Sequence, residues 1–347
     1  MRVAVAMSGG VDSSAAAALL LDAGHDVFGI TMQFTRPCDE GEALHGEDSC
    51  TLAASVAGDL GIEHVTVDLA ADFDARVVEP FATAYADGST PNPCVTCNEQ
   101  VKFGLLLDRA LDHGAEAMAT GHYARTVRDA GGVWLERAAD RSKDQSYFLY
   151  RLSPAALERV IFPLGEMTKA EVRAYASARS LPVADRRDSQ EVCFCTDHVA
   201  LVAERHPEAL EPGPIVDAAG VVLGTHRGIA RYTVGQRKRL GLAGPLGPYQ
   251  VLGIDAGRNE IVVGPVECGA RTSVVLQDAV WRLGGPADAT AQGRYRSTSV
   301  PARVAPSGES LRVEFDAPVA ALAPGQSVVL YRGDRVLGGG IVPFEST

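Results

Sequence analysis

A polar turn interrupts the apolar amino-terminal sequence, and it reads Ser8-Gly9-Gly10-Val11-Asp12-Ser13. The run before it, Arg2 to Met7, predicts a buried parallel strand. The alanine- and leucine-rich run from Asp12 to Ala23 predicts a helix that ends at Gly24. Asp26 to Met32 predicts the next strand, so the chain begins with a βαβ unit of a doubly wound parallel sheet.

The turn lies where such sheets bind their ligands, beyond the carboxyl end of a strand. Glycines let backbone N–H groups approach a phosphate, and a helix N-terminus adds positive potential. A Walker loop would need a lysine after its glycines, and this turn has none. A nucleophile elbow would need glycine where Ala6 stands. A phosphate cradle and a simple tight turn remain as interpretations.

Composition limits the class of protein. The 347 residues suggest two or three domains, and 46% hydrophobic with 22% charged residues indicates a soluble globular chain. No secretory signal and no apolar run of ~18 residues is evident, so we expect a cytoplasmic protein without a membrane partner. The net charge of −12 argues weakly against nucleic acid, and seven cysteines argue against structural disulfides.

The pattern of predicted elements changes along the chain. Strands and helices alternate to about residue 200, and Thr168 with Glu171 predicts a capping box. From Pro207 onward glycine, proline and short strands dominate, which is typical of a small antiparallel barrel. We therefore predict an α/β domain over residues 1–206, a small central domain over 207–268 and a carboxyl-terminal β-barrel over 269–347.

Two cysteine motifs follow the polar turn. Cys94 and Cys97 form a C-x-x-C before a predicted helix, whose N-terminus would lower a thiol pKa. Cys193 and Cys195 lie in the stretch DSQEVCFCTD. Taken alone, these cysteines fit redox chemistry, metal binding or chance.

Six motifs occur in one order along the chain. They are SGGVDS, TPNPCVTCNEQVKFG from Thr90, GHYAR from Gly121, KDQSYFL from Lys143, DSQEVCF from Asp188 and GQRKRLG from Gly235. The first resembles the pyrophosphate loop of the ATP pyrophosphatases. Together they resemble the bacterial tRNA-specific 2-thiouridylases, which thiolate the wobble uridine of certain tRNAs.

The resemblance implies a role for each matching residue. ATP would contact Ala6, Met7, Ser8, Gly9, Gly10, Val11, Asp12, Ser13, Met32 and Gly121, with magnesium near Asp12. The target base would approach Asn92, Pro93 and Cys94. Other parts of tRNA would contact Lys143, Asp144, Gln145, Arg294 and Tyr295. Cys97 would be a catalytic thiol, Cys193 would carry a persulfide, and a cysteine desulfurase or sulfur-relay protein would supply the sulfur.

The expected reaction replaces the position-2 oxygen of uridine by sulfur. Transfer of AMP makes that oxygen a good leaving group, and a persulfide on Cys193 attacks the carbon. Cys97 then cleaves the sulfur–sulfur bond and forms a Cys97–Cys193 disulfide. Alternatively, Cys193 releases hydrogen sulfide, which attacks instead.

One residue departs from the family pattern. Well-studied members have aspartate where this chain has Cys94, which leaves the acid or base role of that position open. Cys94, Cys97 and Cys193 could instead hold a 4Fe-4S cluster with one open iron. Zinc with Cys195 or water is a further alternative, as is a small apolar role for Cys94.

Several residues have a plain structural interpretation beside a functional one. The basic residues Arg227, Arg231, Arg237, Lys238 and Arg239 predict a phosphate-binding surface with Tyr232 interleaved. We expect Cys268 to be buried and His122 to be a base or a packed, hydrogen-bonded side chain. The loop with Cys38, His45 and Cys50 has irregular metal-ligand spacing. Two rival functions are an amidating ATP pyrophosphatase and a non-catalytic metal-binding RNA module.

Overall fold

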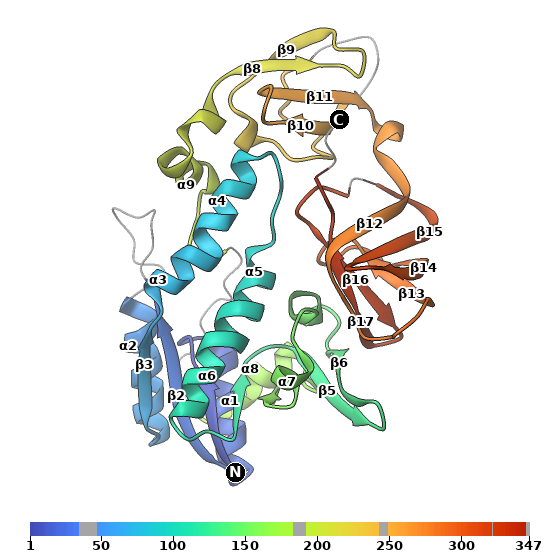
Figure 1. Ribbon diagram of the computed structural model, residues 1–347. Coiled ribbons are helices and arrows are strands. Elements are labelled where there is room, and N and C mark those ends of the chain that lie inside the picture. Colours follow the sequence, from blue (N-terminus) through green and yellow to red (C-terminus); the bar gives the residue numbers. More distant parts are fainter. Residues whose placement is uncertain (35–46, 183–191, 243–248, 321, 345–347) are drawn as a thin grey trace. The chain divides into compact units, whose positions relative to one another are not determined.

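The structure is a computed structural model that describes residues 1–34, 47–182, 192–242, 249–320 and 322–344 (Figure 1). The chain divides into two compact units, which are described separately. Unit 1 contains Met1–Val77, Cys94–Thr196 and Asp334–Val336. Unit 2 contains Val78–Pro93, Asp197–Gly333 and Leu337–Thr347.

Unit 1 is built on a five-stranded sheet in the order β3-β2-β1-β4-β7. The strands are β1 (Arg2–Ala6), β2 (Asp26–Gln33), β3 (His64–Asp68), β4 (Ala117–Thr120) and β7 (Val160–Ile161), and neighbouring strands are parallel. The chain moves from β1 to β3 on one side and then returns to place β4 on the other side of β1. The predicted doubly wound sheet is confirmed, and its strand order reverses between β1 and β4.

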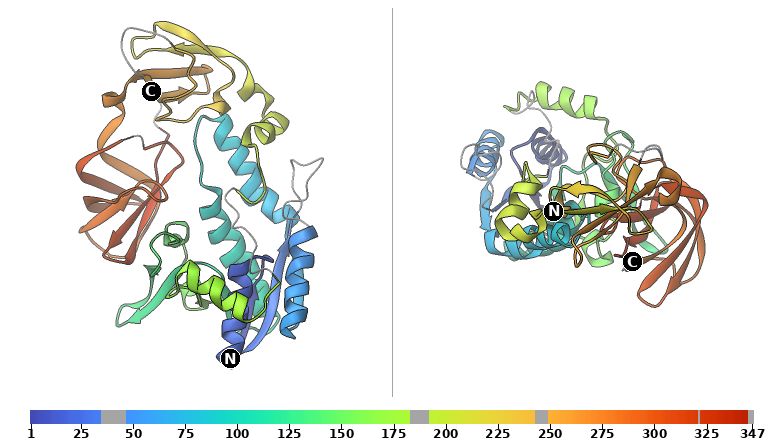
Figure 2. Two further views of the ribbon diagram at one scale, coloured as in Figure 1. Left: turned by 180° about the vertical axis from the view of Figure 1, so that it is seen from behind. Right: turned by 90° about the horizontal axis from the view of Figure 1, so that it is seen from above.

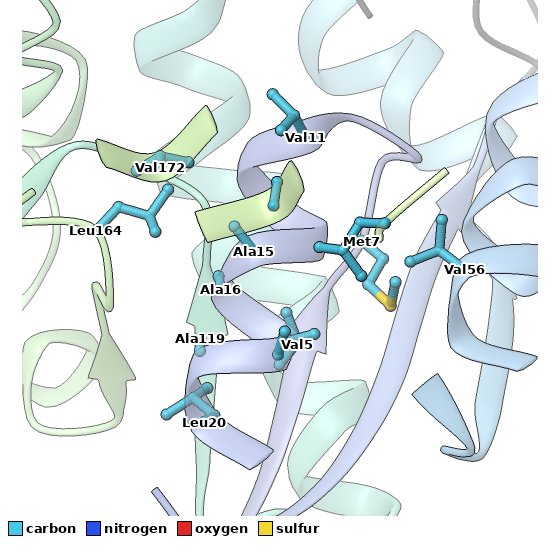
Figure 3. Packing of buried hydrophobic residues seen from close by; sticks show 14 of the residues in the cluster. Val5, Met7, Val11, Ala15, Ala16, Leu20, Val56, Ala119, Leu164 and Val172 are labelled. Atoms are coloured by element: carbon cyan, nitrogen blue, oxygen red, sulfur yellow. The ribbon is translucent and has the colours of Figure 1, made fainter. Parts of the chain in front are cut away.

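Helix α1 (Val11–Asp22) packs closely on this sheet because half of its buried residues are alanines. Ala15 and Ala16 share one buried cluster with Val5 of β1 and Val172 of α8 (Lys169–Ala178), as Figure 3 shows. The predicted capping box starts α8, where Thr168 and Glu171 each bond to the other's backbone N–H. Helix α2 (Glu47–Leu60) supplies Val56 to the same cluster.

The segment that carries two of the cysteines is one continuous run of helix. It consists of α5 (Pro93–Thr96), the π-helix η2 (Cys97–Leu106) and α6 (Leu107–Asp112). The sequence predicted a helix from Asn98 onward, so the observed helix begins five residues earlier. The π-helix makes two tertiary contacts: Glu99 pairs with Arg151 at 2.6 Å, and the Asn98 amide donates to Phe148 O at 3.2 Å. A one-dimensional pattern does not contain these contacts.

The remaining elements of unit 1 are short. They are α3 (Ala70–Phe73), the π-helix η1 (Asp74–Val78), β5 (Ala124–Asp129), β6 (Gly132–Arg137), η3 (Ser146–Leu149) and α7 (Pro154–Leu157). Strands β5 and β6 form an antiparallel hairpin that follows β4 directly.

Unit 2 begins with two helices and a four-stranded sheet. The helices are α4 (Glu79–Ala86) and α9 (His198–Arg205), followed by the short turns η4 (Pro207–Leu210), η5 (Ile229–Arg231) and η6 (Val266–Gly269). The sheet has the order β10-β11-β8-β9, from β8 (Gly213–Val216), β9 (Val222–His226), β10 (Tyr249–Asp255) and β11 (Glu260–Pro265).

The last part of unit 2 is a closed antiparallel barrel, drawn in orange and red in Figure 2. Its strands are β12 (Ala270–Trp281), β13 (Ala287–Gln292), β14 (Val300–Ser307), β15 (Ser310–Ala320), β16 (Ser327–Arg332) and β17 (Arg335–Ile341). Pairing of β12 with β17 closes it. A Cβ on Gly338 would lie 1.9 Å from Val280 O, so glycine is required where these strands meet. The predicted carboxyl-terminal barrel is confirmed.

Among the helices of the described residues, none combines the length and the apolar character that a membrane span needs.

Candidate active site

The polar turn is a tight loop fastened by its own hydroxyl groups. Ser8 N–H donates to Ser13 Oγ at 3.2 Å, and Ser13 Oγ lies 3.1 Å from Gly10 O, to which it donates. Gly9 has a φ of +68°, and a Cβ there would lie 2.9 Å from Leu52 Cβ, so glycine is needed for conformation and for space. Gly10 caps α1 without any side-chain hydrogen bond, and this leaves the first-turn N–H groups for an anion.

Gly121 lies directly against this helix start. A Cβ at Gly121 would be 2.7 Å from both Asp12 C and Ser13 N, so no other residue fits without moving the loop. Gly121 follows β4 and Ser8 follows β1, which places both at the point where the strand order reverses. The half-buried Met32 lies in β2, the strand beside β1. The structure therefore brings the predicted ATP-contacting residues to one edge of the sheet.

Asp12 has two partners that the sequence reasoning missed. Lys169 Nζ lies 2.8 Å from each carboxylate oxygen of Asp12, and the Tyr123 hydroxyl donates to Oδ1 at 2.9 Å. Lys169 is the first residue of α8, and its side chain is 12% exposed. The sequence contained one signal for this contact. The capping box at Thr168 predicts a helix start there, which makes Lys169 the first residue of α8. Lys169 thus brings a positive charge to the phosphate loop that the loop itself lacks.

The thiols of unit 1 form a second group. Cys94 is exposed in α5, Cys97 is 6% exposed at the start of η2, and Cys193 is half-buried. The charges of the three act on one another: Cys193 raises the pKa of Cys94, and both raise the pKa of Cys97. All are reduced thiols in the structure. The predicted catalytic thiols are therefore close enough to interact electrostatically.

The predicted lowering of the thiol pKa is wrong. Burial raises the pKa of Cys97 to about 12, and only in second place does the Lys102 ammonium lower it. The pKa of Cys94 is also raised. The main cause is desolvation by the surrounding protein, although the residue is exposed, and the second cause is the charge of Cys193. Cys97 lies inside continuous helix, so the N-terminal field of a helix does not reach it as the sequence suggested.

Aromatic packing fixes the segment that carries Cys193. The neighbouring Phe194 is buried, and its ring meets the Phe73 ring edge-on with centroids 5.6 Å apart. Phe73 stacks in turn on Phe34 at 4.3 Å. Cys195 is buried beside this group. The Phe194 side chain therefore anchors the backbone that carries Cys193, the predicted persulfide cysteine.

His122 links the two groups and is a packed, hydrogen-bonded side chain. Its Nδ1 lies 2.8 Å from Thr120 Oγ1, and its ring packs near Phe103 and Phe162. Burial and then the Lys102 charge hold the pKa of His122 well below 6.5. The imidazole is therefore neutral at physiological pH.

Asp144 and Gln145 of the motif KDQ make hydrogen bonds within the protein. Asp144 is buried, accepts from the N–H groups of Ala138 and Ser146, and pairs with Arg137 at 3.3 Å. Gln145 Oε1 accepts from Tyr123 N–H at 2.9 Å. Lys143 is half-buried. The roles of these residues toward tRNA stay a prediction, in which Asp144 and Gln145 would act by shaping the segment.

Unit 2 carries the remaining predicted tRNA contacts. Arg237, Lys238 and Arg239 are exposed, whereas Tyr232 is buried and meets the ring of His226 at 6.0 Å. The prediction that Tyr232 lies interleaved among the exposed basic residues of this surface is therefore wrong. Arg294 is exposed and Tyr295 is half-buried, with the Arg296 guanidinium 5.1 Å from its ring centroid.

Asn92, in the loop before α5, is half-buried, and Pro93, the first residue of α5, is buried. Cys268 is exposed in η6, so its predicted burial is wrong; η6 lies at the junction of β11 and β12 and not in the barrel interior. Cys38 and His45 lie outside the described residues, and Cys50 is half-buried in α2.

The donor groups of the described residues do not form a site for a single metal ion. Within the described ranges, no three His, Cys, Asp or Glu side chains are grouped so that they could hold one. The structure therefore gives a 4Fe-4S cluster on Cys94, Cys97 and Cys193 no support.

Three family models match consecutive parts of the chain. The model described as "tRNA methyl transferase HUP domain" matches residues 1–197, the PRC-barrel domain of the same family matches 200–265, and an "Aminomethyltransferase beta-barrel domain" matches 271–342. Each agrees in class with the part of the fold that it covers.

Curated relatives match the chain over its length. A protein of Chloroflexus aggregans named "tRNA-specific 2-thiouridylase MnmA" is 48% identical over 98% of this chain and 97% of its own length. A protein of Trichlorobacter lovleyi with the same name is 47% identical over 100% of this chain and 98% of its own. These names specify thiolation, whereas the family description mentions methyl transfer.

Proposed function

The chain belongs to the family of tRNA-specific 2-thiouridylases, and on that premise we propose which of its residues carry out the ATP-dependent 2-thiolation of tRNA. The observation that carries the proposal is the fit of Gly121 against Asp12 and Ser13. It brings the phosphate loop and the segment of His122 together at one sheet edge. The charge of Lys102 acts on His122 in this segment and also on Cys94 and Cys97.

ATP binding is assigned to the loop after β1. The N–H groups of the first turn of α1 and the hydroxyls of Ser8 and Ser13 would hold the pyrophosphate. Lys169 lies within reach of the same phosphates because it already contacts Asp12. Asp12 is the oxygen ligand of the loop that suits Mg²⁺, and the ion would neutralise the leaving pyrophosphate.

The sulfur step is assigned to a persulfide relay. The uridine oxygen attacks the α-phosphorus of ATP and pyrophosphate leaves. The terminal sulfur of a persulfide on Cys193 attacks carbon 2, and AMP departs with the oxygen. Cys97, whose pKa burial raises to about 12, gives up its proton to solvent and attacks the Cys193 sulfur. The bond to the transferred sulfur breaks, and a Cys97–Cys193 disulfide remains.

The alternatives have less support. No three of the described side chains are grouped to hold a metal ion, so a 4Fe-4S cluster on Cys94, Cys97 and Cys193 has no support here, and no step is derived through it. An amidating pyrophosphatase has no use for catalytic thiols. A non-catalytic RNA module would not need the ATP loop that Gly9 and Gly121 shape.

The RNA surface is assigned to exposed cations of unit 2. Arg237, Lys238 and Arg239 would contact phosphates, and Arg294 with Tyr295 would contact the RNA elsewhere. A cysteine desulfurase or a sulfur-relay protein would load Cys193 with sulfur. We place this reaction in the cytoplasm, where tRNA and ATP are available.

The experiment separates activation of the base from sulfur transfer. Asp12→Asn, Cys97→Ser and Cys193→Ser enzymes receive ATP, tRNA and a cysteine desulfurase with cysteine, without free sulfide. We expect Asp12→Asn to stop tRNA-dependent pyrophosphate release. Both cysteine variants should form no 2-thiouridine, while Cys268→Ser, which removes an exposed thiol, behaves as wild type. Formation of 2-thiouridine by Cys193→Ser would refute the relay.

A further inference from the structure

Cys94 places a third thiol one helical turn before Cys97. Cys94 lies in α5, and Cys97 is the first residue of the π-helix that continues it. Helical residues three apart have Cβ atoms about 5–6 Å apart. A disulfide needs about 3.5–4.5 Å between Cβ atoms, so a small movement of the first turn would join the two.

Exposure distinguishes the three thiols. Cys97 is 6% exposed, Cys193 is half-buried, and Cys94 is exposed. A reductant in solution therefore reaches Cys94 more readily than Cys97. The negative charge of Cys193 acts on both Cys94 and Cys97, which places all three within interaction range.

The persulfide relay leaves a disulfide that must be opened before the next turnover. Each turnover ends with a disulfide between Cys97 and Cys193, and Cys193 must become a thiol again before it accepts more sulfur. One sulfur of that disulfide belongs to a buried residue. Direct attack on it by an external thiol is hindered, because exchange rates depend on access.

We infer that Cys94 is a resolving cysteine, which moves the disulfide from the Cys97–Cys193 pair to the Cys94–Cys97 pair. The inference rests on the proposed relay. The Cys94 thiolate attacks Sγ of Cys97, a Cys94–Cys97 bond forms, and the Cys97–Cys193 bond breaks. The electron pair leaves on Cys193, which takes up the proton that Cys94 gave away. This exchange is neutral in electrons.

Reduction then occurs at the exposed position. An external dithiol attacks Cys94, supplies two electrons, and leaves as its own disulfide. Lys102 is placed to assist, since its positive charge acts on both Cys94 and Cys97 and stabilises the thiolates that each exchange releases. Cys193 is already a thiol at this stage and can be loaded with sulfur.

The test maps disulfides after one turnover. Full-length enzyme loaded with persulfide is mixed with ATP and tRNA without reductant, quenched in acid, alkylated and analysed by peptide mass spectrometry. Disulfides are counted per 2-thiouridine formed. We expect Cys94–Cys97 in the wild type and Cys97–Cys193 in both Cys94→Ser and Cys94→Ala. Cys268→Ser, which removes another exposed thiol, should match the wild type.

Recovery supplies a second measurement. After dithiol is added, the Cys193 thiol should reappear about tenfold more slowly in Cys94→Ser than in the wild type, because access limits exchange. A Cys97–Cys193 disulfide in the wild type that recovers as fast as in Cys94→Ser overturns the resolving role and leaves the relay intact. No disulfide in either protein, with 2-thiouridine formed, overturns the relay and the resolving role together.

Discussion

Lys169 Nζ lies 2.8 Å from both carboxylate oxygens of Asp12, which joins the start of α8 to the start of α1. The pair lies at the loop that is proposed above to hold pyrophosphate. A bound phosphate competes with Asp12 for the same ammonium. Lys169 therefore neutralises the carboxylate before ATP arrives and would bind phosphate once Mg²⁺ takes over Asp12.

Replacing Lys169 by Met should reduce pyrophosphate release by about 10²-fold or more, because one positive group aimed at the developing charge is lost. The free energy of unfolding should fall by about 1–2 kcal/mol, since Asp12 keeps only part of its stabilisation. Pyrophosphate release with saturating tRNA and chemical denaturation measure the two effects. Arg179→Met is the matched control: it removes a cation from the other end of α8, paired with Asp22 on the surface.

Gly121→Ala tests the contact that defines the site. The new Cβ would lie 2.7 Å from two backbone atoms of the α1 start, so the phosphate loop must shift. We expect a loss of about 1–3 kcal/mol in unfolding free energy and a marked rise in the KM for ATP. Gly58→Ala is the control, because a Cβ there meets nothing within 4 Å in a helix. That variant should bind ATP normally and gain up to about 1 kcal/mol.

His122 should make the protein sensitive to mild acid. Its pKa is held well below 6.5 by burial and by Lys102, so the unfolded chain binds a proton that the folded chain refuses. The stability that it contributes is present above pH 6.5 and is lost as pH falls below that value. Each pH unit of this loss amounts to at most about 1.4 kcal/mol.

Denaturation of His122→Gln from pH 7.5 to pH 5 measures that contribution, and the slope with pH should be shallower than in the wild type. His64 and His226, whose pKa values burial also lowers, retain their share of the slope. The exposed His113→Gln serves as the control. An unchanged slope in His122→Gln would show that the imidazole titrates alike in both states.

The sequence predicted the parts of the fold that depend on local patterns. The βαβ start, the capping box at Thr168 and the short strands of the barrel follow from periodicity and from turn residues. The sequence did not predict the π-helix at Cys97 or the pairing of its Glu99 with Arg151, a residue 52 positions away. Burial of Tyr232 and exposure of Cys268 likewise depend on tertiary packing.

The motifs supplied the residues that are proposed for the site, but they did not indicate its electrostatics. The motifs placed Gly121 with the phosphate loop and Cys97 with Cys193. They did not indicate that Lys169 neutralises Asp12, nor that burial raises the pKa of Cys97 to about 12. Both effects come from the tertiary packing of helices whose partners are distant in sequence.

Charge reversal at Arg237, Lys238 and Arg239 should weaken tRNA binding for all substrate tRNAs alike, because phosphate contacts position the RNA and do not select its sequence. If all three bind phosphates, the slope of log K against log salt should fall in magnitude by about 2. Binding is measured by filter retention or fluorescence anisotropy between low and moderate salt. The side chains are exposed, so the variant should fold normally.

The matched control reverses Arg258, Arg303 and Arg312, which are exposed elsewhere in unit 2 and change the net charge by the same amount. If loss of affinity came from net charge alone, both triple variants would weaken binding equally. A local phosphate-binding surface instead predicts a loss confined to the 237–239 variant, together with its smaller salt slope. Equal affinity and equal slopes in that variant and the wild type would remove this surface from the proposed path of the tRNA.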